Sequence, residues 1–370
     1  MTTPAPTQPL PHPAGGAARR AKWRLPRVQE LGLLVVVLVI GTVLAVYGHF
    51  DAPPGGRNTF LNVDNLVGQV ATYMAVYAIM AVGVTCVIIT GGIDISVGAI
   101  FALSAMVCAD VLQRLRPDAP AWQSIPIAIL VAPGVGLVCG LINGALVTLV
   151  RLHPFIVTLG TMSIFRMVAN VWTREKTLPN QGREIPESFT TDFMYRYFFE
   201  SAPGVGGVQL MPLMVTLAVV ALGWFYLRMT VMGRENYAVG GNEEAARFSG
   251  IRVNLVKLRV YAISGVAAGI AAVVNLGWFS TTSSSTGFGY ELSVIAAAVV
   301  GGASLTGGRG TALGALLGAT VIRLIENGIF KMHLNQEYSL GIVGGAIILA
   351  VSIDRFSEYV RERRLARVAR

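Results

Sequence analysis

The chain has 370 residues, of which 54% are hydrophobic and only 13% are charged. Soluble domains carry about 25% charged residues, so this composition excludes an ordinary soluble protein. The net charge of +9 does not indicate nucleic-acid binding, because positive residues also gather on the cytoplasmic side of membrane proteins. The three cysteines, Cys86, Cys108 and Cys139, fall inside apolar runs and form no metal-binding or disulfide spacing.

Residues 1–30 are rich in Pro, Ala and Gly and end in a basic cluster. This composition cannot build a core and predicts a disordered tail. The apolar run 31–47 follows directly. A cleaved signal peptide is the alternative interpretation of this run. The absence of a small-x-small cleavage site after Ala45 favours a retained helix.

Nine further apolar runs follow the first. A transmembrane helix needs about 20 apolar residues, and long runs favour helices over the alternating pattern of a barrel. We therefore predict an all-α polytopic membrane protein with about ten spans in a domain 31–354, followed by a basic tail 355–370. The predicted spans are 31–47, 66–90, 97–113, 125–150, 155–173, 209–228, 258–277, 290–306, 311–330 and 340–354.

The distribution of Lys and Arg predicts the orientation. Most of them fall on the side of the two termini, which places both termini and the stretch 229–257 in the cytoplasm. The segment 174–208 is then outside. Its aromatic residues suggest an interfacial helix, although an irregular loop with ordinary belt aromatics is an equal alternative. These aromatics are Phe189, Phe193, Tyr195, Tyr197, Phe198 and Phe199.

The cytoplasmic stretch carries the signals of a short capped helix. Asn242 is a good N-cap because its side-chain oxygen can accept a free amide. Glu243 and Glu244 follow in the first turn, where the helix dipole favours negative charge. Gly250 stands about two turns later, where a left-handed C-cap favours glycine. Such a helix has little core of its own, so we expect it to bind a partner or lie on the lipid surface.

Two glycine-rich connections stand out, at residues 90–98 and 300–308. In the first, Asp94 or Ser96 can cap the next helix. Alternatively, the break lines a polar pathway, because irregular backbone at membrane depth is tolerated only beside a cavity or inside protein. The similarity of the two connections is weak evidence for an internal repeat.

Other polar groups lie in or beside the spans. Such groups usually face the interior of a helix bundle. The ionisable ones are Asp94, Arg166, Arg323 and Glu326. Arg323 and Glu326 are three residues apart and can pair on one helix. The remaining candidates could line a solute path or form interhelical hydrogen bonds. They are Asn143, Thr158, Thr161, Asn170 and Glu291.

Catalytic signatures are missing. The glycine-rich residues 306–311 lack the lysine of a phosphate-binding loop, and the four histidines make no metal-ligand spacing. The chain therefore does not hydrolyse ATP by itself. One rival function is a secondary sugar–proton symporter that uses Asp94 or Glu326 as its coupling carboxylate. A membrane-embedded enzyme or scaffold is the other, and no catalytic cluster supports it.

Five segments together resemble the membrane permeases of ribose-type bacterial ABC sugar importers. They are 90–100, 143–166, 238–251, 289–318, and Asn327-Gly328 with the final span. The resemblance implies ten spans in the inner membrane and a dimer of permeases. It also implies two partners, which are a cytoplasmic ATP-binding subunit carrying ATP and Mg and a periplasmic sugar-binding protein. No cofactor is expected on this chain.

The resemblance also implies a role for the capped helix. In ABC importers a loop of the Glu-Ala-Ala…Gly type docks into the ATPase, and Glu244, Ala245, Ala246 and Gly250 match that pattern. Asn242, Glu243, Arg247 and Phe248 are implied as neighbouring contacts, with Phe248 as a hydrophobic anchor.

Some positions depart from the pattern of the family. In such permeases an arginine often stands shortly before the Gly-Tyr-Glu-Leu segment, but residues 278–289 contain none. Ser293 follows Leu292 where an aspartate is usual. Met167 follows Arg166 where a glycine is common, and Glu326 precedes Asn327 where an uncharged residue is usual. These departures leave the sugar unspecified but not the class of protein.

Overall fold

A computed structural model describes residues 28–346 except 54–55, 174–176, 195–196 and 199–207, together with residues 348, 349 and 352. The tail predicted for residues 1–30 lies outside this part up to residue 27, and residues 28–30 already belong to the first helix. The basic tail predicted for residues 355–370 lies wholly outside it.

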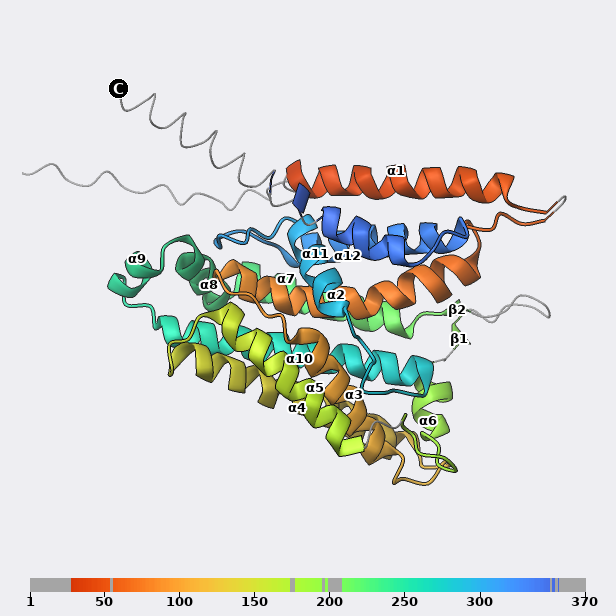
Figure 1. The fold of residues 1–370 in the computed structure, drawn as a ribbon, viewed down its shortest axis with the longest axis horizontal. Coiled ribbons are helices and arrows are strands. Elements are labelled where there is room, and N and C mark those ends of the chain that lie inside the picture. The colour runs from red at the N-terminus through yellow and green to blue at the C-terminus, as the bar shows by residue number, and fades with distance from the viewer. Residues whose placement is uncertain are drawn as a thin grey trace, which may run out of the picture.

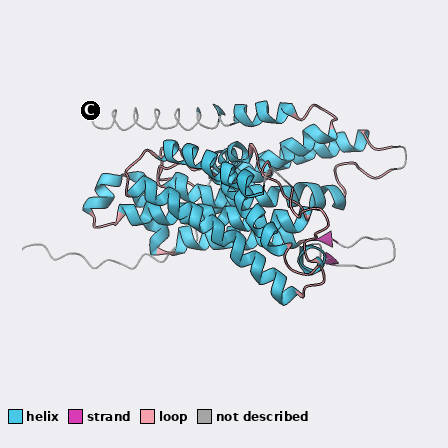
Figure 2. Ribbon diagram, turned by 60° about the horizontal axis from the view of Figure 1, so that its bottom comes forward, coloured by secondary structure: helices cyan, strands magenta, loops and turns pink. Residues whose placement is uncertain are grey.

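Long helices lying side by side make up most of the described chain (Figure 1). Short π-helical segments η1 (Asp64–Ala71) and η2 (Thr190–Met194), the turn α6 (Glu187–Phe189) and the strands β1 (Tyr197–Phe198) and β2 (Val208–Gln209) complete it. Figure 2 shows that the two strands lie together at one end. The helices are α1 (Val28–Phe50), α2 (Thr72–Ile89), α3 (Val97–Leu112), α4 (Ala121–Thr148), α5 (Pro154–Thr173), α7 (Met211–Met229), α8 (Val231–Gly241), α9 (Glu243–Phe248), α10 (Val253–Phe279), α11 (Tyr290–Val300) and α12 (Ala312–Lys331).

The structure confirms a polytopic helical membrane protein. Among the described residues, seven helices are long and apolar enough to cross a bilayer, while α3 and α11 are apolar but shorter. The predicted span 290–306 is too long, because the chain turns at Gly302, with φ +95°, directly after α11. In the predicted span 340–354, residues 340–346 are helical, and most of the remainder lies outside the described residues.

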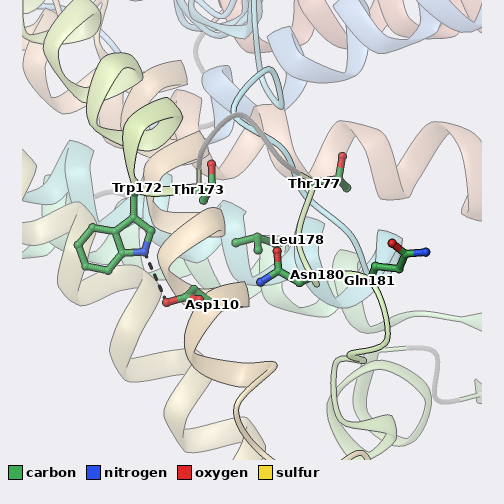
Figure 3. Close-up of a pocket in the computed structure, with 7 residues that line it drawn as sticks. All are labelled: Asp110, Trp172, Thr173, Thr177, Leu178, Asn180 and Gln181. Atoms are coloured by element: carbon green, nitrogen blue, oxygen red, sulfur yellow. Dashed lines mark hydrogen bonds between the residues drawn. The ribbon is translucent and has the colours of Figure 1, made fainter.

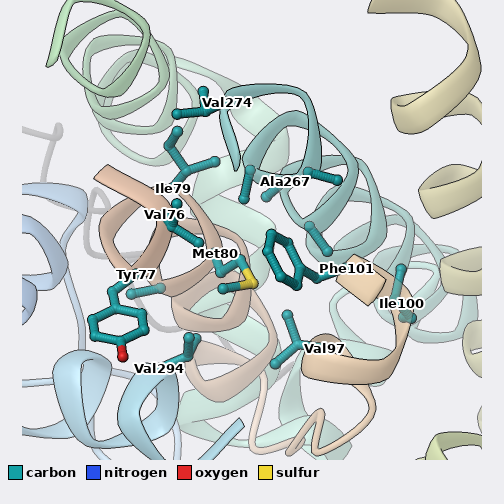
Figure 4. Packing of buried hydrophobic residues seen from close by; sticks show 14 of the residues in the cluster. Val76, Tyr77, Ile79, Met80, Val97, Ile100, Phe101, Ala267, Val274 and Val294 are labelled. Carbon is teal, nitrogen blue, oxygen red and sulfur yellow. The ribbon is translucent and has the colours of Figure 1, made fainter. Parts of the chain in front are cut away.

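Helix α2 is the centre of the bundle. Almost all of its residues are buried, and it contacts α7, α8, α10, α11 and α12. Figure 4 shows Met80 of α2 beside Phe101 of α3, with Ala267 of α10 and Val294 of α11 around them. In contrast, α1 lies at the edge of the bundle, where most of its large apolar side chains are exposed, as expected for a lipid-facing helix.

Helices α4 and α10 approach each other closely through small residues. A Cβ at Gly136 would lie 2.0 Å from the carbonyl oxygen of Gly265, and one at Gly140 would lie 2.3 Å from that of Tyr261. No side chain fits between these backbones. This is the close packing that small residues permit between membrane helices.

The predicted cytoplasmic stretch 229–257 and the described part of the predicted outer segment 174–208 lie at opposite ends of the bundle. Helix α9 projects at one end, whereas α6, β1 and β2 lie at the other (Figure 1). In the described part of the segment 174–208, residues 187–194 are helical through α6 and η2, and two short strands follow. Phe189 is fully buried and Phe193 packs against the core, so these aromatics are internal.

Candidate functional site

The capped helix α9 forms as the sequence predicts. The side chain of Asn242 accepts a hydrogen bond from the backbone N–H of Ala245 at 2.9 Å. At the other end, Gly250 has φ +83°. The N–H of Gly250 donates to the carbonyl of Arg247, and that of Ile251 to the carbonyl of Ala246, each at 3.1 Å. These two bonds form a Schellman motif, so both ends of α9 are fixed by local contacts.

Only part of α9 is free to meet another protein. Ala246 is buried and anchors the helix in a small apolar cluster with Val239, Val253 and Val256. Glu243 pairs with Arg247 at 3.1 Å and with Lys257 at 2.7 Å, so its charge is used within the chain. Phe248 is 86% exposed. The outward face of α9 is therefore formed by exposed Glu244, Ala245 and Phe248.

This geometry gives a prediction for the C-terminal cap. A Cβ at Gly250 or at Gly241 would meet nothing within 4 Å, but only Gly250 has a positive φ. Replacing Gly250 with alanine should therefore cost α9 about 1–2 kcal/mol of local stability, whereas Gly241→Ala should not. Amide hydrogen exchange over 243–250 measures the difference. Equal protection of the two variants would contradict the prediction.

Four of the predicted pathway residues meet in one buried network. Asp94 accepts hydrogen bonds from the hydroxyls of Ser96 (2.6 Å) and Ser264 (2.7 Å), and from the backbone N–H of Ser96 (3.1 Å). Asn143 donates to the Ser96 hydroxyl at 2.7 Å, and Thr161 donates to Asn143 at 2.7 Å. The network joins the turn 90–96 to α4, α5 and α10.

Four members of this network are 0% exposed, and the fifth, Thr161, is 3% exposed. Thr158 lies beside it and donates to the carbonyl of Ile93 at 3.3 Å. In the described conformation these groups therefore bind one another rather than face an open channel. Of the two alternatives for Ser96, a side-chain cap is wrong, because its hydroxyl makes no bond to the start of α3. Ser264 was not among the predicted pathway residues, although it is a polar residue within a predicted span.

Two other candidates lie apart from this network. Asn170 is half-buried on α5, with no part in the network. Glu291 stands in the first turn of α11, and its Oε2 is buried without a hydrogen-bond partner among the described residues. A Cβ at Gly98 would lie 2.5 Å from that oxygen, so the carboxylate packs closely against the first turn of α3.

Arg166 anchors the connection between α10 and α11. Its Nη1 donates to the carbonyls of Ser284 (2.9 Å) and Thr286 (3.0 Å). Its guanidinium also lies 5.7 Å from the ring centroid of Phe288, which is 78% exposed. No residue pattern predicts this tether, because the bonds go to backbone carbonyls of a distant loop.

The predicted pair on α12 is confirmed. Arg323 lies 3.0 Å from Glu326, and its guanidinium also stacks 4.4 Å above the ring of Tyr73. Tyr77 donates to the other carboxylate oxygen of Glu326 at 3.4 Å. The carboxylate therefore has two partners within the protein, as expected for a structural role.

A polar cavity of about 590 Å³ opens at the end of the bundle opposite α9. Figure 3 shows Trp172 and Asp110 on one side, and Asn180 and Gln181 on the other. The carboxylate of Asp110 is already engaged by Arg114 at 2.6 Å and by the indole of Trp172 at 3.4 Å. The cavity therefore lies on the predicted outer side, and the carboxylate that lines it is bound to side chains of the protein itself.

Comparison with known proteins decides the family. Residues 66–351 match the family model of the branched-chain amino acid transport system permease component. The chain is 35% identical over 332 residues to the ribose import permease of Bacillus subtilis. The aligned region covers 89% of this chain and 93% of that protein. The chain belongs to the permeases of ribose-type ABC importers.

Two further relatives differ in the sugars that their names give. The D-allose transport system permease of Escherichia coli is 34% identical over 86% of this chain and 90% of its own length. The galactose/methyl galactoside import permease of the same organism is 33% identical over 94% of this chain and 100% of its own length. The likeness to this permease family extends over nearly the whole chain, and it is similar for relatives named for different sugars.

Proposed function

We propose that this permease moves a monosaccharide or related polyol across the bacterial inner membrane, driven by a separate ATP-binding subunit. That subunit would carry ATP and Mg, and a periplasmic binding protein would deliver the sugar. Two permease chains, as a homodimer or heterodimer, would form the pathway. Each would have ten spans with both termini in the cytoplasm. The names of the relatives support a sugar cargo.

Helix α9 carries the proposal of an external ATPase. A six-residue helix is too short to be stable alone, yet caps at both ends and the buried Ala246 hold it in place. It presents an 86% exposed Phe248 at the end of the bundle opposite the predicted outer segment. A rigid helix with an exposed aromatic residue suits insertion into a cleft of a partner.

The pathway residues are proposed to act in two ways. The network around Asp94, Ser96, Asn143 and Thr161 would hold the turn 90–96 in one of the two transport conformations. Glu291, whose Oε2 lacks a partner, would meet the solute or water when the helices rearrange. Transport then depends on two conformations of unequal stability, biased by ATP on one side and by loaded binding protein on the other.

The role of Glu326 on α12 distinguishes an ATP-driven importer from a proton symporter. We expect Glu326→Gln to keep ATP-driven uptake, because the carboxylate only serves Arg323 and Tyr77. A symporter using this carboxylate would lose uptake completely on the same change. Uptake of labelled D-ribose, D-allose and D-galactose into proteoliposomes of the complete complex measures the outcome. Loss of uptake with unchanged ATPase association would contradict the proposal.

A further inference from the structure

Three glycine-containing segments from distant parts of the chain meet at the end of the bundle that carries α9. They are residues 89–92 at the end of α2 and in the turn that follows it, Gly240 near the end of helix α8, and residues 307–310 in the turn before α12. The N–H of Gly308 donates to the carbonyl of Ile89 at 2.8 Å, which joins the first segment to the third. We call these three segments the glycine junction.

Gly240 of α8 lies between the other two turns. A Cβ on Gly240 would lie 1.7 Å from the carbonyl oxygen of Ile89 and 2.6 Å from the amide nitrogen of Gly308. A Cβ on Gly307 would lie 2.7 Å from the carbonyl oxygen of Gly240. Real Cβ atoms do not approach backbone atoms so closely, so α8 touches both turns backbone to backbone. Packed backbones leave no flexible side chain to absorb a displacement.

A second contact fixes α8 one turn earlier. The hydroxyl of Tyr237 donates to the carbonyl of Gly310 at 2.8 Å. Because Tyr237 and Gly240 are three residues apart on one helix, both face the same side of α8. The helix is therefore held against the start of α12 at two points.

The junction continues into the buried polar network. The turn that begins at Ile89 runs directly into Asp94 and Ser96, which bind Ser264 of α10 and Asn143 of α4. Thr161 of α5 is bound in turn to Asn143. An unbroken series of short contacts thus leads from α8 through the junction to three membrane helices.

We infer that Gly240 is a positioning residue through which displacement of α9 moves the turn 89–96 and the start of α12. The inference rests on the proposed docking of an ATPase to α9. The glycines at both connections then serve close backbone contact. This gives a physical reason for the two glycine-rich motifs at 90–98 and 300–308, independent of any repeat.

The test compares Gly240→Ala with Gly241→Ala in the complete complex. A Cβ on Gly241 meets nothing within 4 Å, so the neighbouring glycine is a matched control. For Gly240→Ala we expect retained pull-down of the ATP-binding subunit and retained ATP hydrolysis, with sugar uptake per ATP lowered about tenfold or more. Gly241→Ala should match the unaltered protein in all three measurements.

Tyr237→Phe covers the case in which Gly240→Ala fails to fold, because it removes one hydroxyl and adds no atom. It should also lower uptake per ATP while the complex stays assembled. Unchanged uptake per ATP in both variants would overturn the inference. So would a parallel loss of uptake and ATPase pull-down in Tyr237→Phe, since the junction would then only hold the fold. Failure of the unaltered permease to bind any ATPase would instead contradict the proposed function.

Discussion

Replacing Phe248 with alanine should release the ATP-binding subunit and abolish uptake. The side chain is 86% exposed on a helix whose two ends are capped, so its removal leaves the permease fold intact. An aromatic anchor buried at the centre of an interface contributes about 2 kcal/mol or more. Affinity for the ATPase should therefore fall about 30-fold, as measured by pull-down or surface plasmon resonance with the purified permease.

Phe50 provides a matched control. It is 81% exposed and ends α1, at the end of the bundle opposite α9 (Figure 1). Phe50→Ala should keep ATPase association and uptake. Glu244→Lys, which reverses a charge on the same outward face of α9, should weaken association as Phe248→Ala does. Wild-type association of both α9 variants would show that another surface holds the ATPase.

The second large effect concerns the buried network. Asp94→Ala should strongly reduce folded permease, because it leaves the hydroxyls of Ser96 and Ser264 without their acceptor in a fully buried site. Each buried polar group left unpaired costs about 1–3 kcal/mol. Thermal unfolding in detergent, followed by fluorescence-detected size exclusion, measures the loss.

Two serines on membrane helices make the comparison sharper. Ser264 and Ser104 are both 0% exposed, but Ser264 donates to Asp94 at 2.7 Å whereas the hydroxyl of Ser104 has no hydrogen-bond partner within the described chain. Ser264→Ala should therefore lower the unfolding temperature, and Ser104→Ala should leave it unchanged or raise it. Equal unfolding temperatures for the two variants would contradict a stabilising role of the network.

Local signals predicted the local structure well. Asn242 and Gly250 define α9 through short-range capping bonds, and the Arg323–Glu326 spacing predicted their pair. Long apolar runs predicted most spans within a few residues. The predicted end of α11 was wrong, because Ala303 and Leu305 continue the apolar run of the helix. Only the turn at Gly302 marks the break.

Contacts between distant segments could not be predicted. Asp94 and Ser96 stand in a glycine-rich connection, and Asn143 and Thr161 are polar residues in apolar spans. Nothing in their spacing predicted that they bind one another. The tether from Arg166 to the carbonyls of Ser284 and Thr286 carries no side-chain signature in the loop. Likewise, the contact of Gly240 with Ile89 and Gly308 depends on how helix α8 packs against two distant turns.

An uptake measurement in proteoliposomes shows whether ATP hydrolysis by a separate subunit drives transport. Proteoliposomes would contain the permease with its ATP-binding subunit, with ATP inside and sugar-loaded binding protein outside. We predict uptake only when ATP, the ATP-binding subunit and an intact Phe248 are all present. Uptake by the permease alone, driven by a proton gradient without ATP, would contradict an ATP-driven importer.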